Sequence, residues 1–405
     1  MVDFALTARE SEWRKKAKAF VREHVIPRTD LDTHGSFPRD LYEKAFDEGF
    51  VTAMIPAELG GGGRTVFEVS LSAEEFGYGD LGVATSTFLL GLAAGGLVHF
   101  GTPEQKERWI KPLTSELRFA SHAWTEPQGS ANLLGQPATT TARPVEGGFL
   151  LNGIKSTISN ATVASTFFVF ARIESVPASE STPSPGSASS PGSASGSGGL
   201  TCFIVPRSAN GIETRSPYKK MGQRASDTGE ITFRDVFVPK EDQLGRPGEG
   251  AVIAMRALRA SRTGIAAMAV GVARRARDLV IQHGHSRVAG DGRKLIEQQD
   301  FRFHVAAMEA DIEAARALTW RAAAELPDGP EATKLSSCAK LVSANMAVRT
   351  TNQAIEMLGG HGYLESSLAE KLFRDAKILQ IYEGPQAIQK MMIADTVTRL
   401  SWIGR

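Results

Sequence analysis

The spacing of hydrophobic residues divides the chain into three stretches. In the first, apolar side chains recur every three to four residues, as along the buried face of a helix. The clearest example is the set Trp13, Ala17, Phe20 and Val21. From about residue 119 to about residue 238, short runs of β-branched and aromatic residues are typical of strands. The helical period then returns, rich in alanine, and extends to about residue 400.

Glycine breaks and capping residues in the first stretch predict where its helices begin and end. One helical pattern ends at Gly49, and Gly60–Gly63 form a break that is too flexible for a helix interior. Thr102 and Pro103 begin another helix as N-cap and first residue. The most apolar segment, Phe88–Phe100, is shorter than the about 20 residues that a membrane span needs. It predicts a buried helix.

Turn residues bound each run of the β region. The predicted strands are Phe149–Leu151 running into a turn at Asn152–Gly153, then Thr166–Arg172, Leu200–Val205 and Glu230–Val238. Ser175–Gly199 interrupts them with Ser, Pro, Gly and Ala, which cannot form a packed core. We expect a disordered insertion at 175–199, tolerated as a surface loop; an unstructured docking tag is the competing interpretation.

The last stretch contains helical patterns long enough for a bundle of antiparallel helices. They cover Ala251–Gln282, Leu295–Glu325, Glu331–Leu358 and Pro385–Leu400. The pattern therefore predicts an α+β protein of three domains: an N-terminal helical domain at 1–118, a β domain at 119–240 and a C-terminal helical bundle at 241–405.

Composition narrows the class of protein. The 405 residues contain 46 Lys and Arg against 45 Asp and Glu, a formal net charge of +1 that weighs against a nucleic-acid binder. The two cysteines, Cys202 and Cys338, predict reduced core thiols rather than a disulfide framework. Met1–Glu12 lacks a secretory apolar core, so we expect a soluble, cytoplasmic protein. The histidines do not fall at metal-ligand spacing, and no metal is expected.

Composition alone names no reaction, and the chain has no Rossmann fingerprint after a strand, no Walker loop and no serine-hydrolase elbow. It does contain a set of short strings in a fixed order. They are Trp124–Pro127 followed by Gly129-Ser130, Leu151–Asn160, Lys220–Thr228, Leu358–Tyr363, Arg374–Lys377 and Ile381–Pro385. At these residues the sequence resembles the acyl-CoA dehydrogenase family, in its medium- and short-chain-like branch. The resemblance covers the chain except the insertion.

The resemblance implies a fold, a cofactor and an assembly. The fold is an N-terminal helical domain, a middle β-barrel domain and a C-terminal four-helix bundle, in the order that the periodicity predicts. FAD is held between the β domain and the bundle, and a neighbouring subunit completes its site. Such enzymes are homo-oligomers, dimers or tetramers. The family's reaction is the α,β-dehydrogenation of an acyl thioester, with an electron-transfer flavoprotein as the electron acceptor.

Glu383 is the candidate catalytic base. The resemblance implies that it takes the α-proton while flavin N5 takes the β-hydrogen as hydride, chemistry for which a redox cofactor is needed. Burial beside an apolar acyl chain would raise the pKa of such a carboxyl group. From the local sequence alone, a helix-start glutamate that complements the helix dipole is the favoured interpretation, and the resemblance reverses that preference. Some branches carry the base at the position of Ser261, which cannot serve as one.

The resemblance also implies binding residues. For the flavin ring they are Trp124, Thr125, Ser130, Ile158 and Ser159; for the adenosine diphosphate, across the dimer, they are Arg287, Gln299, Glu356, Gly359 and Gly360; for the acyl thioester they are Ser130, Arg262, Tyr382 and Gly384. Without the resemblance, Arg262 reads as a solvated helix arginine, Arg287 as a surface arginine and Gly359–Gly360 as a helix stop.

The sequence departs from the family pattern around the flavin and the thioester entrance. The loop Gln128–Asn132 is one residue shorter and lacks an acid, and Thr157 replaces an aromatic residue. Arg259 stands where an acid is common, and Pro385 and Ala387 replace Thr and Gln. Weak FAD binding and an acyl-carrier-protein substrate in place of CoA are therefore hypotheses. The same fold would also suit an oxidase, a monooxygenase or a non-redox binding protein, and the acyl chain length stays open.

Overall fold

The computed structural model describes residues 5–35, 37–129, 138–174, 199–325 and 329–403, so nearly all of the predicted insertion lies outside the described residues. Contacts within the chain group it into two compact units. We call Met1–Gly91, Lys219–Ser226 and Leu258–Arg405 the helical unit, and Leu92–Tyr218 with Asp227–Ala257 the β unit. The three predicted domain boundaries stay predictions.

The N-terminal part of the helical unit is a series of capped helices. They are α1 (Ala8–Phe20), the π-helical turn η1 (Val21–Val25), α2 (Arg39–Asp47), the 3-10 turn η2 (Ala57–Leu59), α3 (Val66–Gly79) and the first half of α4 (Leu81–Phe100). Thr7 and Thr65 form capping boxes at the starts of α1 and α3. The helical pattern of the sequence is confirmed here.

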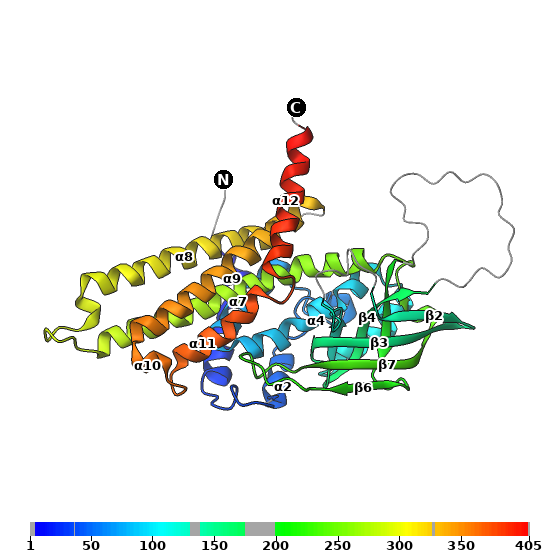
Figure 1. Ribbon diagram of the computed structural model, residues 1–405, viewed down its shortest axis with the longest axis horizontal. Helices are drawn as coiled ribbons and strands as arrows, with labels where there is room; N and C mark the ends of the chain where they lie inside the picture. The colour runs from blue at the N-terminus through cyan, green and yellow to red at the C-terminus, as the bar shows by residue number, and fades with distance from the viewer. Residues whose placement is uncertain (1–4, 36, 130–137, 175–198, 326–328, 404–405) are drawn as a thin grey trace. The chain divides into compact units, whose positions relative to one another are not determined.

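The C-terminal part is the predicted helical bundle. Its elements are α7 (Gly250–Ser286), the 3-10 turn η4 (Leu295–Glu297), α8 (Gln299–Ala324), α9 (Pro330–Leu358), α10 (Gly360–Tyr363), α11 (Leu368–Lys377), the 3-10 turn η5 (Ile378–Gln380) and α12 (Gln386–Ile403). In Figure 1, α7, α8 and α9 run side by side as the long rods of the unit.

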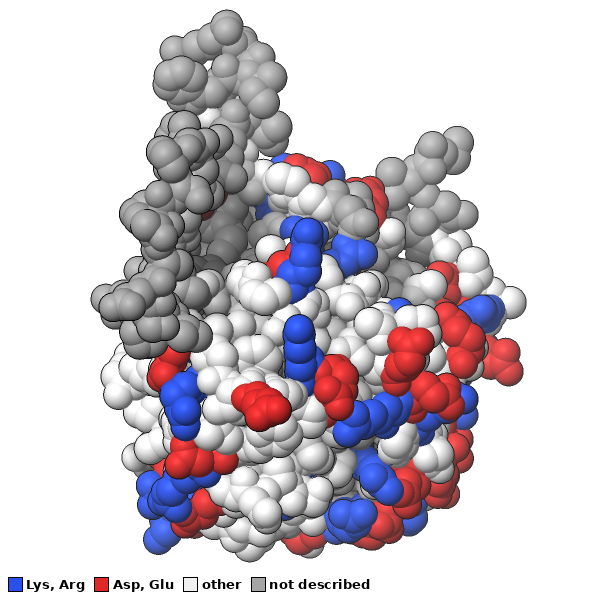
Figure 2. All heavy atoms as spheres, turned by 90° about the vertical axis from the view of Figure 1, so that its right-hand side faces the viewer, with Lys and Arg blue, Asp and Glu red and all other residues white. Residues whose placement is uncertain are grey.

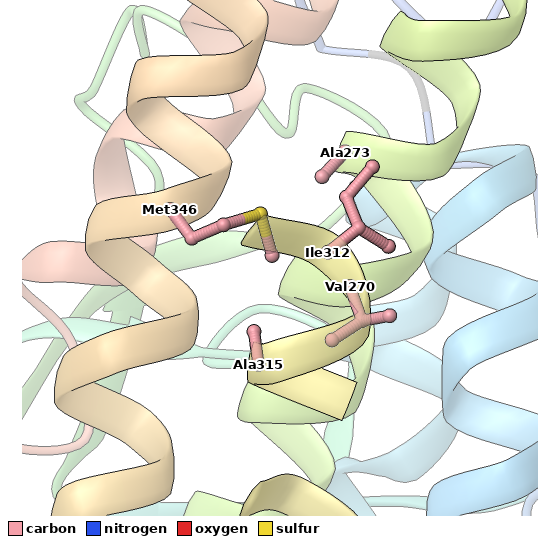
Figure 3. Packing of buried hydrophobic residues seen from close by; sticks show 5 residues of the cluster. All are labelled: Val270, Ala273, Ile312, Ala315 and Met346. Atoms are coloured by element: carbon pink, nitrogen blue, oxygen red, sulfur yellow. The ribbon is translucent and has the colours of Figure 1, made fainter. Parts of the chain in front are cut away.

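Small residues let these long helices pack closely. Val270 and Ala273 of α7, Ile312 and Ala315 of α8 and Met346 of α9 point toward one another in Figure 3, and each is at most 1% exposed. Alanine at a helix contact permits a short interaxial distance, and methionine fills the remaining irregular space. The alanine-rich sequence of this stretch is therefore the reason for its packing.

The β unit is built on a mixed sheet. Its strands are β1 (Phe119–Ala123), β2 (Thr141–Val145), β3 (Gly148–Ser159), β4 (Ala164–Ile173), β5 (Leu200–Pro206), β6 (Ile212–Arg215), β7 (Thr228–Pro239) and β8 (Gln243–Leu244). The strand order is β6-β7-β3-β2-β4-β5-β8, and β1 pairs with β4 in parallel. The second half of α4 and the short helices α5 (Pro103–Trp109) and α6 (Lys111–Ser115) complete the unit, and Thr102 caps α5 as predicted.

The predicted turn at Asn152–Gly153 is wrong. β3 continues through these residues, and its register with β7 shifts between Leu151 and Gly153, which marks a β-bulge. Gly153 has a φ of +144°, and a Cβ there would lie 2.7 Å from the Cα of Thr140. Asn152 exchanges hydrogen bonds with Asp235 of β7 at 2.9 Å. Tertiary contacts therefore convert a turn sequence into a bulge.

The apolar helix α4 is covered by the rest of the chain. Among the described residues, Leu81–Phe100 is the one helix whose length and composition would allow it to cross a membrane, and 83% of its most apolar window is buried. That burial agrees with the predicted core helix. On the face shown in Figure 2, basic and acidic side chains are interspersed, as the near-zero net charge predicts.

Candidate active site

Glu383 lies on a tight turn between η5 and α12 in the helical unit. Its φ is +53°, and Gly384 follows with a φ of +97°. The left-handed region is uncommon for a residue with a side chain, and such strain clusters at functional sites. The turn that the sequence places before the last helix is therefore an unusual backbone conformation that the surrounding residues must hold.

Three buried donors hold the carbonyl groups of this turn. Gln389 of α12 donates to the carbonyl oxygens of Glu383 at 3.1 Å and of Gly384 at 2.9 Å. Lys340 of α9 donates to the Gly384 carbonyl at 2.8 Å, and Arg262 of α7 to the Glu383 carbonyl at 3.4 Å. Each donor side chain is at most 1% exposed. Three helices thus fix the backbone on which Glu383 stands.

The carboxyl group of Glu383 has a different partner. The hydroxyl of Ser261, one residue before Arg262 on α7, donates to Glu383 Oε2 at 2.5 Å. Burial raises the pKa of Glu383, and the Ser261 hydrogen bond and the charges of Arg262 and Lys340 lower it only in part. A carboxylate with a raised pKa is a stronger base, so this group suits proton abstraction.

The two cations near Glu383 are themselves strongly desolvated. Burial lowers the pKa of Lys340 to about 8 and that of Arg262 to about 10. Arg262 Nη1 is buried and has no hydrogen-bond partner in the part of the chain that the structure describes. Arg262 is thus no solvated helix arginine: it is a buried cation beside the candidate base, with a free donor.

Tyr382 joins the turn to a second group of motif residues. Gln223 donates to the Tyr382 hydroxyl at 3.4 Å and accepts from Thr85 of α4 at 2.9 Å, and its backbone N–H donates to Asp375 of α11. Burial raises the pKa of Tyr382 to about 12. The strings around Gln223, Asp375 and Glu383 therefore meet within the helical unit, although more than a hundred residues separate the first from the others.

In the β unit, the strings that begin at Trp124 and Leu151 lie side by side. The Ser156 N–H donates to the Thr125 carbonyl at 2.9 Å, and Lys155 Nζ donates to the Trp124 carbonyl at 3.2 Å. The Ser121 hydroxyl donates to the Ser159 carbonyl at 2.9 Å. These bonds bring together the residues that the resemblance assigns to the flavin ring.

A buried ion pair supports this arrangement. Lys155 Nζ lies 2.8 Å from Glu126 Oε1, and the two side chains are at most 2% exposed. Glu126 also accepts from the N–H and hydroxyl of Thr139 and from the N–H of Thr140. Burial raises the pKa of Glu126, but Lys155 and Thr139 outweigh it and bring the pKa to about 2. Glu126 is a structural carboxylate that fixes the loop after β1.

The predicted ring-binding residues differ in what they can offer a flavin. Trp124, Thr125 and Ser159 are half-buried, whereas Ile158 is 2% exposed and can contribute only its backbone. Thr157 is exposed and has a φ of +52°. Ser130 lies outside the described residues. The hydroxyls of Thr125 and Ser159 can donate to or accept from polar atoms of a flavin edge, so the side chains present fit the cofactor.

The residues assigned to the adenosine diphosphate lie at one end of the helical bundle. Gly284 of α7 packs against Phe301 of α8, and Gln353 of α9 hydrogen-bonds His304 of α8 at 2.7 Å, so the relevant helix ends are neighbours. The assigned side chains and glycines are all exposed: Arg287, Gln299, Glu356, Gly359 and Gly360. Gly359 ends α9 with a φ of +59° and open space beside it, so it is a helix stop that also permits close approach.

Other candidate sites are weaker. A surface cavity of about 540 Å³ at α1 is lined by Arg9, Glu12, Trp13, Lys16, Gly62 and Arg64. Its arginines already pair with the buried carboxylate of Glu68, so the cavity offers little free charge. No group of His, Cys, Asp and Glu side chains suited to a metal ion occurs in the described ranges of the chain.

Sequence reasoning misses three residues of the Glu383 cluster. It treats Ser261 only as a replaced base, and it does not single out Lys340 or Gln389. A signal for Lys340 exists: it is the one lysine on a face of α9 otherwise formed by small and apolar residues such as Ser336, Ala344 and Ala347, all buried. Nothing in the local sequence of Gln389 points to its role.

Comparisons with known proteins match nearly all of the chain to one family. Residues 7–116, 121–236 and 248–398 match the N-terminal, middle and C-terminal domains of acyl-CoA dehydrogenases. The chain is 34% identical over 389 residues to the mitochondrial short-chain specific acyl-CoA dehydrogenase of Rattus norvegicus, covering 95% of this chain and 89% of the relative.

Two solved structures resemble the fold. Butyryl-CoA dehydrogenase from Megasphaera elsdenii has a TM-score of 0.88 and 32% identity, over 98% of this chain and 100% of that chain. Acyl-CoA dehydrogenase from Bacillus anthracis, complexed with FAD, has a TM-score of 0.87 and 26% identity, over 100% of this chain and 69% of that chain. The chain belongs to the acyl-CoA dehydrogenase family, whose members are oxidoreductases that act on CH–CH bonds.

Proposed function

We propose that the protein catalyses the α,β-dehydrogenation of an acyl-CoA, with Glu383 as the base that takes the α-proton. The observation that carries the proposal is the Glu383 turn: a carboxyl group with a raised pKa on a left-handed backbone that three buried donors hold. A base is effective when its pKa lies near the working pH and its position is fixed.

The residues of the chain divide the work between proton transfer and orientation. Glu383 accepts the α-proton on a carboxylate oxygen, and its backbone N–H is proposed to donate to the thioester oxygen, where negative charge develops. Arg262, whose Nη1 has no hydrogen-bond partner among the described residues, would add positive charge near that oxygen. Tyr382 and Gly384 flank the base and set the walls and backbone of the thioester site.

FAD, when bound, would supply the acceptor that takes the β-hydrogen as hydride, a role that no side chain can fill. Trp124, Thr125, Ser159 and the backbone of Ile158 would hold its ring. Arg287, Gln299, Glu356, Gly359 and Gly360 would hold the adenosine diphosphate of a cofactor bound to a second copy of the chain. Exposed polar side chains and an open glycine suit that contact.

The relatives favour a short acyl chain, since those described above are named short-chain specific acyl-CoA dehydrogenase and butyryl-CoA dehydrogenase. We further propose a homo-oligomer, a cytoplasmic location and an electron-transfer flavoprotein as the acceptor of the electrons. CoA is the proposed carrier of the acyl group; acyl-carrier protein is an outcome that the experiment distinguishes.

The test is an anaerobic visible spectrum of the FAD-loaded protein, recorded as straight-chain acyl-CoA thioesters from butyryl to octanoyl are added. Bleaching of the flavin band, fastest with butyryl-CoA, is the expected result. In Glu383→Gln the rate should fall by at least about 1,000-fold, because the base is removed while the shape is kept. Glu43→Gln, at an exposed glutamate paired with Arg39, is the matched control.

Three outcomes would contradict the proposal. If no acyl-CoA bleaches the flavin but the same acyl group on a carrier protein does, the carrier protein rather than CoA is the acyl carrier. Unchanged bleaching in Glu383→Gln would remove Glu383 as the base. Stoichiometric peroxide release during aerobic turnover would identify an oxidase rather than a dehydrogenase that passes its electrons to a flavoprotein.

A further inference from the structure

The hydroxyl of Ser261 lies between two acceptors. It is 2.5 Å from Glu383 Oε2 and 3.3 Å from the carbonyl oxygen of Leu258, three residues earlier on α7. A serine hydroxyl carries one proton and can donate it to only one acceptor at a time, while its oxygen can also accept. The hydroxyl proton therefore has two possible orientations, and it is donated to Glu383 in only one of them.

We propose that Ser261 is a positioning residue for Glu383, whose hydroxyl turns toward the carboxylate when Glu383 is ionised and toward the Leu258 carbonyl when Glu383 has taken a proton. The inference rests on the proposed function, because it assigns a role to the proton that the base gains. It needs no movement of the backbone and no shift of a heavy atom.

The ionised state favours the first orientation. A hydrogen bond to a charged acceptor is shorter and stronger than one to a neutral carbonyl, so the carboxylate competes successfully for the proton of Ser261. Among the described residues, Ser261 is the one hydrogen-bond donor to a carboxyl oxygen of Glu383. The hydroxyl thus aims the carboxylate and holds it in one rotamer before the substrate's α-proton is transferred.

The protonated state favours the second orientation. Once the α-proton is on Glu383, the carboxyl group has a donor of its own, which the Ser261 oxygen can accept, and the Ser261 proton turns to Leu258. The Ser261 hydroxyl and Glu383 Oε2 each keep a partner in both states, which avoids the cost of leaving either of them unsatisfied. The substrate loses one proton, Glu383 gains it, and no other proton leaves or enters.

The other groups that face Glu383 do not provide this exchange. From α7, Arg262 bonds the backbone carbonyl of Glu383, and Arg259 acts on Arg262 through its charge. Lys340 from α9 and Gln389 from α12 bond carbonyl oxygens of the same turn. Because these donors fix the backbone, the turn cannot move to follow the proton. The group that can reorient when Glu383 gains a proton is therefore the hydroxyl of Ser261.

The experiment titrates Glu383 directly in the FAD-loaded protein by infrared difference spectroscopy, with the carboxyl band assigned by its loss in Glu383→Gln. In Ser261→Ala the pKa of Glu383 should rise by about one unit, since a hydrogen bond to the ionised form is lost. The acid limb of the kcat/KM profile should move by the same amount. Ser261→Thr, which keeps a hydroxyl, should restore both.

Thr263→Val is the matched control. Thr263 is buried two residues further along α7, and within the described residues its hydroxyl donates to the helix carbonyl of Ala260, at 2.7 Å, and to no other group. Its loss should leave the Glu383 band unchanged. An equal titration of Glu383 in Ser261→Ala and in the parent protein would overturn the inference. The infrared readout needs no turnover, so it decides the role of Ser261 even where no thioester reduces the flavin.

Discussion

Burial raises the pKa of both Glu126 and Glu383, but their neighbours shift the two pKa values in opposite directions overall. Glu126 is 3% exposed, yet its pKa falls to about 2 because Lys155 and Thr139 act on the carboxylate itself. Glu383 is half-buried, yet its pKa is raised. Burial alone therefore does not separate a structural carboxylate from a catalytic one.

The difference lies in where the nearby cations donate. Lys155 donates to the carboxylate of Glu126, so its charge and its hydrogen bond both favour the ionised form. Lys340 and Arg262 donate instead to backbone carbonyls of the Glu383 turn. Their hydrogen bonds fix the position of the group, and their charges lower its pKa only in part, which leaves Glu383 basic. A glutamate with a nearby lysine therefore stabilises the structure in the β unit and forms a candidate catalytic base in the helical unit.

The comparison predicts its largest effect for Lys155→Met. The substitution leaves the Glu126 carboxylate buried without its cation, a change that costs about 3–5 kcal/mol when one partner of a buried pair is removed. Denaturant unfolding monitored by circular dichroism should show this loss, and the double variant Glu126→Gln/Lys155→Met should recover part of it. A loss below about 1 kcal/mol would mean that the pair does not stabilise the β unit.

The second effect is a pH dependence of stability that Glu126 causes. Its pKa falls from an ordinary 4.5 to about 2, so its contribution is present above pH 4.5 and is lost as the pH falls toward 2. The change amounts to about 3 kcal/mol. Since Glu68 titrates in the same window, the difference between the parent protein and Glu126→Gln is the quantity to measure. A flat difference over this range would contradict the prediction.

The third effect comes from the same substitution in the other unit. Lys340→Met removes a charge that lowers the pKa of Glu383 and one of two donors to the Gly384 carbonyl. We expect kcat/KM to fall by about 10-fold, with the acid limb shifted to higher pH. Stability should change by no more than about 1 kcal/mol, because an unfavourably desolvated cation is also lost. Destabilisation as large as that of Lys155→Met would abolish the distinction between the two lysines.

The smallest predicted effect is that of breaking an exposed ion pair, which serves as the baseline for the buried pairs. Arg234 lies 2.9 Å from Glu213, and the two side chains are 71% and 59% exposed. Arg234→Met should change the free energy of unfolding by less than about 0.5 kcal/mol, since solvent screens such pairs. Thermal unfolding at low and high salt is the measurement. A loss of stability comparable to that of Lys155→Met would show that burial does not determine how much an ion pair stabilises this protein.

Local signals in the sequence predict the elements well. The helical and strand periods locate the long helices and most strands, and Thr102 is identified as a cap because capping is a local hydrogen bond. The turn expected at Asn152–Gly153 fails, since contacts with Thr140 and Asp235 decide that conformation. Neither Thr140 nor Asp235 belongs to the short segment whose sequence predicts the turn.

The candidate site can be predicted only as far as its motifs extend. Glu383 is found through its resemblance to a family string, whereas its partners depend on long-range packing. Ser261 is 122 residues from Glu383, and Lys340 is 44 residues from Gly384. Spacing carries no information over such separations, so the division between donors to carbonyls and donors to the carboxylate appears only in three dimensions.

The path of the chain through its two units has a consequence for how the protein is made. The β unit occupies Leu92–Tyr218 and Asp227–Ala257, whereas the helical unit needs residues from both ends of the chain and Lys219–Ser226 between them. During synthesis, all strands emerge from the ribosome before the long helices are translated. The contacts of Glu74 in α3 with Arg274 and Arg316 can therefore form only when the last third of the chain has been translated. We expect the nascent chain to depend on chaperones most during that interval.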